Sequence, residues 1–122
     1  MPHTLRTFLE SIDNRVMHIH DEIDPISQVG YLCSESRGPL MFHNLTGYPG
    51  WRLSDILIKD RLGQAAAFGL DDIHEVCPYL AGRMSAGKGS SVMVDDGPVK
   101  EVKMLGDEVD LTRLPIPQHS KG

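Results

Sequence analysis

Apolar residues recur at helical spacing near the start of the chain. Their spacing of i, i+3, i+4 and i+7 is typical of an amphipathic helix that packs one face against a core. Thr4 precedes them and suits the N-cap position, where its side chain accepts a backbone hydrogen bond. We therefore predict a helix over residues 4–14. The residues that define its apolar face are Leu5, Phe8, Leu9 and Ile12.

Short alternating or continuous apolar runs predict the strands. Residues 15–20 alternate, and Leu40 to Phe42 form a short apolar run. Two further runs, 92–94 and 99–105, flank the turn sequence Asp96-Gly97-Pro98, which is typical of a hairpin. We predict strands at all four places.

Three more helical segments follow from capping residues. Asp24 and Pro25 suit an N-cap followed by the first helical position. The Ala-rich segment from Arg61 to Phe68 is followed by Gly69, which favours a left-handed C-terminal cap. Asp71 is expected to cap a last helix.

That last helix contains Pro78, which must kink or restart it because proline lacks the backbone N–H. Helices interleaved with strands predict an α/β or α+β fold, a small layered domain with a mixed sheet flanked by helices. Residues 114–117, Leu-Pro-Ile-Pro, are expected to be extended.

Composition narrows the class of protein. The chain has 122 residues, about one domain, with 12 Lys and Arg against 17 Asp and Glu. A net charge of −5 argues against a nucleic-acid partner, because phosphate binding needs clustered cations. No apolar run approaches a membrane span, and the N-terminus lacks a signal-peptide pattern. Two widely spaced cysteines, Cys33 and Cys77, indicate free thiols, so we expect a cytoplasmic protein.

The segment from Gly82 to Gly89 is close to a phosphate-binding P-loop. It lacks the Ser or Thr that should follow Lys88, and it follows a predicted helix where the motif requires a strand. A flexible Gly-Ser loop is the better interpretation.

Histidines offer a second kind of site. His18 and His20 lie two apart on one predicted strand face and could chelate zinc or copper, with Asp21 and Glu22 adjacent. Half-buried strand histidines without a metal are the alternative. The other candidates, His43 beside Asn44 and His119 in the tail, are isolated in sequence.

No constellation supplies a complete active site. The sequence has no nucleophile elbow and no spacing typical of a catalytic triad. Asp107, Glu108 and Asp110 form an acidic cluster, which we expect to be a solvated turn that caps backbone N–H groups. We therefore assign no catalytic, cofactor-binding or metal-binding residue.

Two segments near the C-terminus resemble a known protein family. Residues 95–102, Asp-Asp-Gly-Pro-Val-Lys-Glu-Val, and 106–117, ending Asp-Leu-Thr-Arg-Leu-Pro-Ile-Pro, closely resemble the UbiD-like carboxylases/decarboxylases, which use prenylated FMN. The opening helix, the Asp24-Pro25 helix start, residues 38–50 and the Ala-rich helix also fit, in the right order. The chain departs from the family between residues 53 and 59, where the family usually has a Gly-containing strand and loop.

The resemblance implies an N-terminal domain or small subunit of a decarboxylase that acts reversibly on an unsaturated or aromatic carboxylic acid. It implies a UbiD-like N-terminal α/β domain over residues 1–110. Residues 111–122 would then be a Pro-rich connector toward a flavin-binding domain absent from this chain. The family's prenylated FMN, its divalent metal (manganese or magnesium) and a further candidate ion, potassium, are expected on that domain and none on this chain.

By the same resemblance, this chain alone should be inactive and should work with a catalytic flavin-binding domain or subunit in a homo- or hetero-oligomer. We expect Ile116 and His119 to lie beyond this domain and to contact that partner or a second copy of the chain. The alternative function is a non-catalytic assembly or regulatory subunit of such a decarboxylase, and a more distant alternative is a small metal-binding protein.

Overall fold

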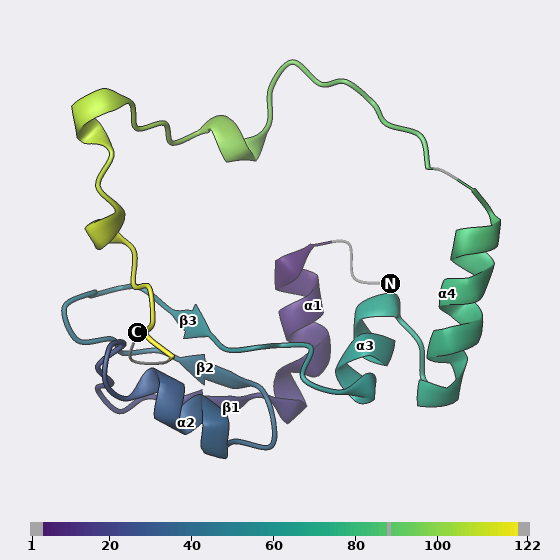
Figure 1. Cartoon of the computed structure of the whole chain (residues 1–122), viewed down its shortest axis with the longest axis horizontal. Helices are drawn as coiled ribbons and strands as arrows, with labels where there is room; N and C mark the ends of the chain where they lie inside the picture. Colours follow the sequence, from purple (N-terminus) through teal and green to yellow (C-terminus); the bar gives the residue numbers. More distant parts are fainter. Residues whose placement is uncertain (1–3, 88, 120–122) are drawn as a thin grey trace.

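A small mixed sheet lies beside the first two helices of the chain (Figure 1). The structure is a computed structural model that describes residues 4–87 and 89–119. In these ranges three strands, β1 (Met17–Ile19), β2 (Leu40–Phe42) and β3 (Leu53–Ser54), lie in the order β1-β2-β3. β1 pairs with β2 in parallel and β3 pairs with β2 in antiparallel orientation. The predicted α+β fold with a mixed sheet is confirmed.

The first helix, α1 (Leu5–Ile12), begins where its cap predicts. Thr4 and Thr7 form a reciprocal capping box, in which each side chain accepts a hydrogen bond from the other's backbone N–H at 3.2 Å. A short 3-10 turn, Asp13–Arg15, follows the helix and leads into β1. The prediction of a helix here is confirmed, although the α-helix itself is shorter than residues 4–14.

The second helix, α2 (Val29–Glu35), begins later than predicted. The carboxylate of Asp24 accepts hydrogen bonds from the N–H of Ile26 at 2.9 Å and from the hydroxyl of Ser27 at 2.6 Å. These bonds close a local turn, which competes with helix formation at the position where we expected the helix to start. The expected start at Asp24-Pro25 is therefore corrected to Val29.

The core has two halves, one on each face of the sheet. Phe42 and Leu40 pack on one side against α2, through residues such as Val29. Met41 points to the opposite side and packs with Phe8 and Ile12 of α1 and with Val16. All three residues of β2 are buried because helices cover both faces of this central strand.

The third helix, α3 (Arg61–Phe68), agrees with the prediction. Asp60 caps its start, and Gly69 ends it with φ 68° and ψ 35°, in the left-handed region. Asp72 caps the next segment, a 3-10 turn over Ile73–Glu75, by accepting from the N–H of His74 at 2.8 Å. The expected cap at Asp71 is thus wrong by one residue.

The last helix, α4 (Val76–Ser85), contains Pro78 in its first turn. A proline is tolerated at this point because the first backbone N–H groups of a helix have no partner within it. Pro78 therefore stands near a helix start, consistent with the restart that we offered as one alternative. The rings of Phe68 and Tyr79, 5.1 Å apart, pack α4 against α3.

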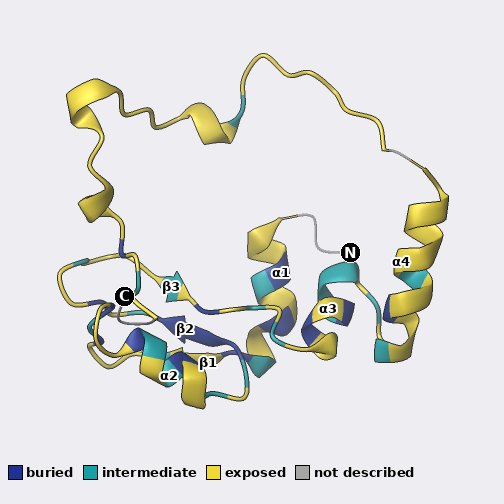
Figure 2. Ribbon diagram, in the orientation of Figure 1, coloured by how far each residue is buried: buried dark blue, intermediate teal, exposed yellow. Residues whose placement is uncertain are grey.

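Residues 89–113 form an extended arm that leaves the end of α4 and arches over the molecule (Figure 1). The predicted strands 92–94 and 99–105 are wrong: the arm contains 3-10 turns, Pro98–Lys100, Gly106–Glu108 and Leu111–Arg113, and no strand. A β-ladder needs a partner for its backbone groups, and no described strand lies beside the arm. Figure 2 shows the arm exposed along most of its length. Its exposed apolar residues are Val92, Met93, Val94, Val99, Val102, Leu105, Val109 and Leu111.

Residues 114–119 form a strap that returns to α2. They are extended, as predicted, and Pro115 is buried. The N–H of Gln118 donates to the carbonyl of Pro25 at 3.2 Å. A Cβ placed on Gly30 would lie 3.0 Å from the Cα of His119, so the strap passes directly over α2. The expectation that His119 lies beyond this domain is therefore corrected.

No helix in the described ranges has both the length and the apolar character needed to cross a membrane. Both cysteines are free, as predicted, with Cys33 buried and Cys77 exposed.

Candidate functional site

Three histidines gather at one end of β1 and β2. His18 lies in β1, His20 directly follows it, and His43 directly follows β2. Parallel pairing, continued by the hydrogen bond from the N–H of His43 to the carbonyl of Ile19 at 2.9 Å, sets the rings side by side. The ring centroids of His20 and His43 are 4.5 Å apart, and those of His18 and His43 are 5.1 Å apart. Sequence spacing had paired His18 with His20 but had left His43 isolated.

A hydrogen-bonded chain runs from Asp13 through His18 to His43. Nε2 of His18 lies 3.1 Å from Oδ1 of Asp13, and its Nδ1 lies 2.8 Å from Nε2 of His43. A carboxylate accepts only, so the neutral arrangement has His18 donating to Asp13 and His43 donating to His18. The tautomers of His18 and His43 follow from these hydrogen-bond partners. The outer atom of the chain, Nδ1 of His43, then keeps its lone pair.

The environment disfavours a charge on His43. Burial lowers the pKa of His43 below its ordinary value, and the neighbouring His20, His18 and Arg52 lower it further. If both rings carried a second proton, two N–H groups would point at each other across the 2.8 Å contact. The surroundings therefore favour the neutral form of the His43 imidazole.

The metal-binding alternative finds no support in the described ranges. Within them, no group of three or more His, Cys, Asp or Glu side chains is arranged to hold a metal ion. The nitrogens of His18 are directed at Asp13 and His43, so they do not converge with their neighbours on one point. Glu22, one of the proposed acidic neighbours, instead accepts a hydrogen bond from Thr46 at 3.2 Å.

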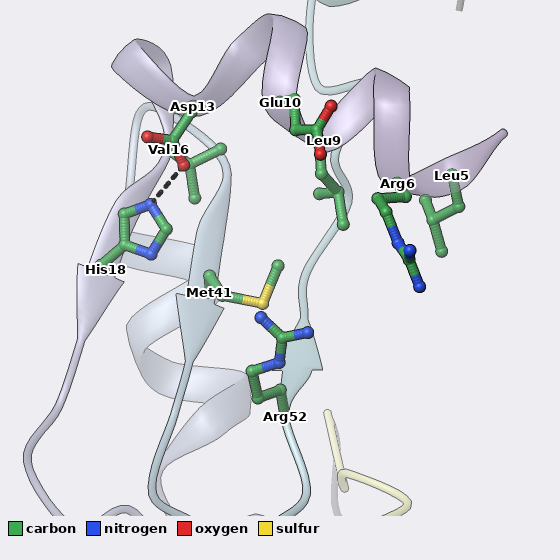
Figure 3. Close-up of a pocket in the computed structure, with 9 residues that line it drawn as sticks. All are labelled: Leu5, Arg6, Leu9, Glu10, Asp13, Val16, His18, Met41 and Arg52. Atoms are coloured by element: carbon green, nitrogen blue, oxygen red, sulfur yellow. Dashed lines mark hydrogen bonds and ion pairs between the residues drawn. The ribbon is translucent and has the colours of Figure 1, made fainter. Parts of the chain in front are cut away.

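An open groove of about 680 Å³ adjoins His18, between α1 and the start of β3 (Figure 3). Its floor is apolar, and Arg6, Arg52, Glu10 and Asp13 bring both charges to its rim. The two carboxylates would repel a phosphate group that approached the arginines. The apolar floor consists of Leu5, Leu9, Val16 and Met41.

The P-loop-like segment does not form a phosphate cradle. Gly82 lies inside α4, and the segment leaves that helix at its C-terminal end. Phosphate sites use the N-terminus of a helix, where N–H groups are free, whereas a C-terminus presents carbonyl oxygens. Lys88 itself lies outside the described residues. The interpretation of this segment as a loop is confirmed for the described residues from Ala86 to Ser91.

The acidic cluster behaves as a capped, solvated turn. Asp107, Glu108 and Asp110 are exposed. Asp110 accepts from the hydroxyl of Thr112 at 2.6 Å and from its N–H at 3.0 Å. These hydrogen bonds lower the pKa of Asp110 below its ordinary value. The cluster therefore serves the local backbone, as its position in the sequence predicted.

Sequence reasoning missed a buried carboxylate at Asp55, just after β3. The residue is 8% exposed, and its Oδ2 has no hydrogen-bond partner among the described residues. The thiol of Cys33 is hydrogen-bonded to Asp55, and burial followed by this contact raises the pKa of Cys33 to about 12. Lys59 donates to the carbonyls of Cys33 at 3.0 Å and Ser36 at 2.7 Å, at the end of α2. The one sequence feature that pointed to Asp55 was that residues 53–59, which include it, depart from the pattern of the UbiD-like family.

Curated relatives of the chain are decarboxylases. No protein-family model matches the chain. The pyrrole-2-carboxylic acid decarboxylase of Pseudomonas aeruginosa is 30% identical over 84% of this chain, which spans 24% of that enzyme. The anhydromevalonate phosphate decarboxylase of Methanosarcina mazei is 26% identical over 95% of this chain and 26% of that enzyme. The chain thus spans about a quarter of the length of these relatives.

The chain is also similar to solved structures of UbiD-class enzymes. An evolved dimeric form of the UbiD-class enzyme HmfF from Pelotomaculum thermopropionicum, in complex with prFMN, matches 99% of this chain with a TM-score of 0.83 and 27% identity. HmfF in complex with FMN matches 98% of the chain with a TM-score of 0.82, also at 27% identity. The chain spans 29% and 28% of these two proteins. In both sequence and fold, the chain is therefore similar to a part of the UbiD-class enzymes.

Proposed function

We propose that this chain is the N-terminal domain, or a separately encoded small subunit, of a UbiD-like decarboxylase. Its substrate class would be an unsaturated or aromatic carboxylic acid, and the reaction would be reversible. One observation carries the proposal: HmfF matches nearly the whole chain, arm included, yet the chain spans less than a third of HmfF. The decarboxylases among the curated relatives support the reaction class.

The cofactor does not fit the described residues of this chain. A flavin phosphate needs a cradle of free N–H groups or clustered cations. The groove beside His18 sets Glu10 and Asp13 against its arginines, and the segment at Gly82 follows the wrong end of a helix. We therefore place prenylated FMN and its divalent metal, manganese or magnesium, on the remaining part of the enzyme, together with potassium if the reaction uses it.

The contribution of this chain would be to bind that remaining part through the arm. The arm exposes a row of aliphatic side chains, and Val102, for example, is 75% exposed. Extended apolar surface of this kind typically marks a protein–protein contact. The strap then leads the chain back to α2, which fixes both ends of the arm on one body.

The proposal is tested by combining the chain with a UbiD-like flavin-binding part, either in one polypeptide or by co-expression. We expect the chain alone to be colourless and inactive, and the combination to decarboxylate. Val102→Asp should weaken the association, whereas Lys103→Ala, its exposed neighbour, should not. A yellow isolated chain whose flavin is confirmed by mass would overturn the assignment of the cofactor.

The same experiment separates the alternative function. If the complex forms but decarboxylation proceeds equally well without this chain, the chain is an assembly or regulatory subunit and has no part in the reaction. Failure of the chain to associate with any UbiD-like catalytic part would overturn both functions.

A further inference from the structure

The carboxylate of Asp55 is only partly satisfied by its surroundings. It is buried, and the Cys33 thiol is hydrogen-bonded to it, yet no described residue donates to Oδ2. A buried carboxylate oxygen without a donor is costly, because it has given up water and received nothing in exchange. The fold therefore leaves a place for one more hydrogen-bond donor at this atom.

A cavity of about 370 Å³ adjoins this carboxylate. Two of its lining residues are basic, Lys59 and His119. The ammonium group of Lys59 is held at the end of α2, where two of its three N–H bonds donate to the carbonyls of Cys33 and Ser36. Ser34 also lines the cavity, but its hydroxyl donates to the carbonyl of Tyr31 at 2.7 Å. The imidazole of His119 is the donor that the strap brings to the wall. The remaining lining residues are Gly30, Cys33, Ser34, Asp55 and Ile56.

The strap carries His119 to the cavity by specific contacts. The N–H of Gln118 donates to the carbonyl of Pro25 before α2. The backbone of the strap then passes so close to α2 that a Cβ on Gly30 would lie 2.8 Å from the carbonyl oxygen of Gln118. A side chain at position 30 would push the strap away, so glycine is required for this approach.

We propose that the imidazole of His119, which lines the cavity but makes no hydrogen bond to Oδ2 of Asp55 in this structure, turns into the cavity, donates an N–H to Oδ2 and so latches the strap onto α2. The latch joins the C-terminal side of the arm to the body of the domain. It fixes the position of residues 114–119 relative to the sheet, whatever reaction the whole protein performs. The inference stands apart from the proposed function, because every contact involved belongs to this chain.

The latch is tested in the intact protein by amide hydrogen exchange of residues 116–119. We expect Asp55→Asn and His119→Ala each to lower protection roughly five- to tenfold, the usual effect of losing one buried hydrogen bond. The double variant should lose no more than either single variant, because both remove the same bond. Gly30→Ala should lower protection at least as much by displacing the backbone.

Two matched controls accompany these variants. Ser34→Ala alters the same cavity without touching the latch, and His74→Ala removes an exposed histidine elsewhere; both should leave the strap protected. If Asp55→Asn proves too unstable to measure, the imidazole N–H of His119 in the unmodified protein should still show slow solvent exchange by NMR.

Three outcomes would overturn the latch. One is unchanged protection in His119→Ala. Another is losses that multiply in the double variant. The third is an effect of Asp55→Asn that His119→Ala does not share, which would assign Oδ2 to a donor other than His119. None of these outcomes depends on association with a flavin-binding part.

Discussion

Arg15 and Asp60 join the first and third helices of the domain. Nη2 of Arg15 donates to both carboxylate oxygens of Asp60, at 3.0 and 2.9 Å, and Oδ1 also accepts from the N–H of Gly63 at 2.8 Å. The backbone bond from Gly63, followed by Arg15, lowers the pKa of Asp60 below its ordinary value. One carboxylate thus caps α3 and ties it to the turn after α1.

Substitutions at this pair should separate the two roles. Asp60→Ala should lower the free energy of unfolding by about 1–2 kcal/mol, because it removes the cap as well as the ion pair. Arg15→Gln should cost about 0–1 kcal/mol, since the pair is partly exposed and screened by water. Urea denaturation of both variants checks the order. A larger loss in Arg15→Gln than in Asp60→Ala would contradict it.

Two glycines should respond to alanine with opposite signs. Gly69 has φ 68°, which an L side chain tolerates poorly, so Gly69→Ala should destabilise the protein by about 1 kcal/mol. Gly82 lies inside α4, and a Cβ at this position would meet nothing within 4 Å, so Gly82→Ala should stabilise by about 0.4–1 kcal/mol. Thermal melting of the two variants against the parent provides the measurement, and a shared sign would refute the assignment.

Acid should weaken the domain through His43. The pKa of His43 is lowered in the folded state, chiefly by burial, so the unfolded chain binds its proton more tightly. Stability should therefore be complete above about pH 6.5, the ordinary histidine value, and should decline as the pH falls from there through the folded pKa. Chemical denaturation between pH 7.5 and 5 should show this decline.

Two matched histidine variants test whether His43 causes this loss of stability at low pH. His43→Gln should flatten the profile, and His74→Gln, at an exposed position, should retain it. A profile that is equally steep in His43→Gln would place the responsible group elsewhere.

The two thiols should differ sharply in reactivity. Alkylation needs the thiolate, and the pKa of Cys33 is raised to about 12 by burial and by Asp55, whereas Cys77 is exposed. At pH 8 a thiol reagent should modify one cysteine of the folded protein rapidly and the second only after denaturation. Cys77→Ser should abolish the rapid reaction, and Cys33→Ser should leave it intact; the reverse pattern would contradict the burial of Cys33.

Local signals predicted what local chemistry decides. Thr4 caps α1 and Gly69 ends α3 because each acts on backbone groups a few residues away. The predicted strand at residues 99–105 failed because a strand needs a partner, and apolar residues alone do not supply one. The helix predicted to start at Asp24 was also misplaced, because the Asp24 side chain stabilises a turn there instead of a helix.

The candidate sites depended on pairing that no local pattern contains. His43 joins His18 only because β1 and β2 run parallel in one register. The cavity at Asp55 assembles from α2, the segment after β3 and the strap, three parts far apart in sequence. Their residues carry ordinary chemistry one by one, and only the tertiary fold brings them together.

The arm is fastened at both ends, by α4 against α3 and by the strap against α2. It is therefore a closed loop, and the entropic cost of closing that loop is part of the folding of this domain. Doubling the length of such a loop would add only about 0.6 kcal/mol, so insertions in the arm should be tolerated far better than their size suggests. A single cut in the arm would have a different effect: the strap would become a separate peptide, held at its site by affinity alone and lost on dilution.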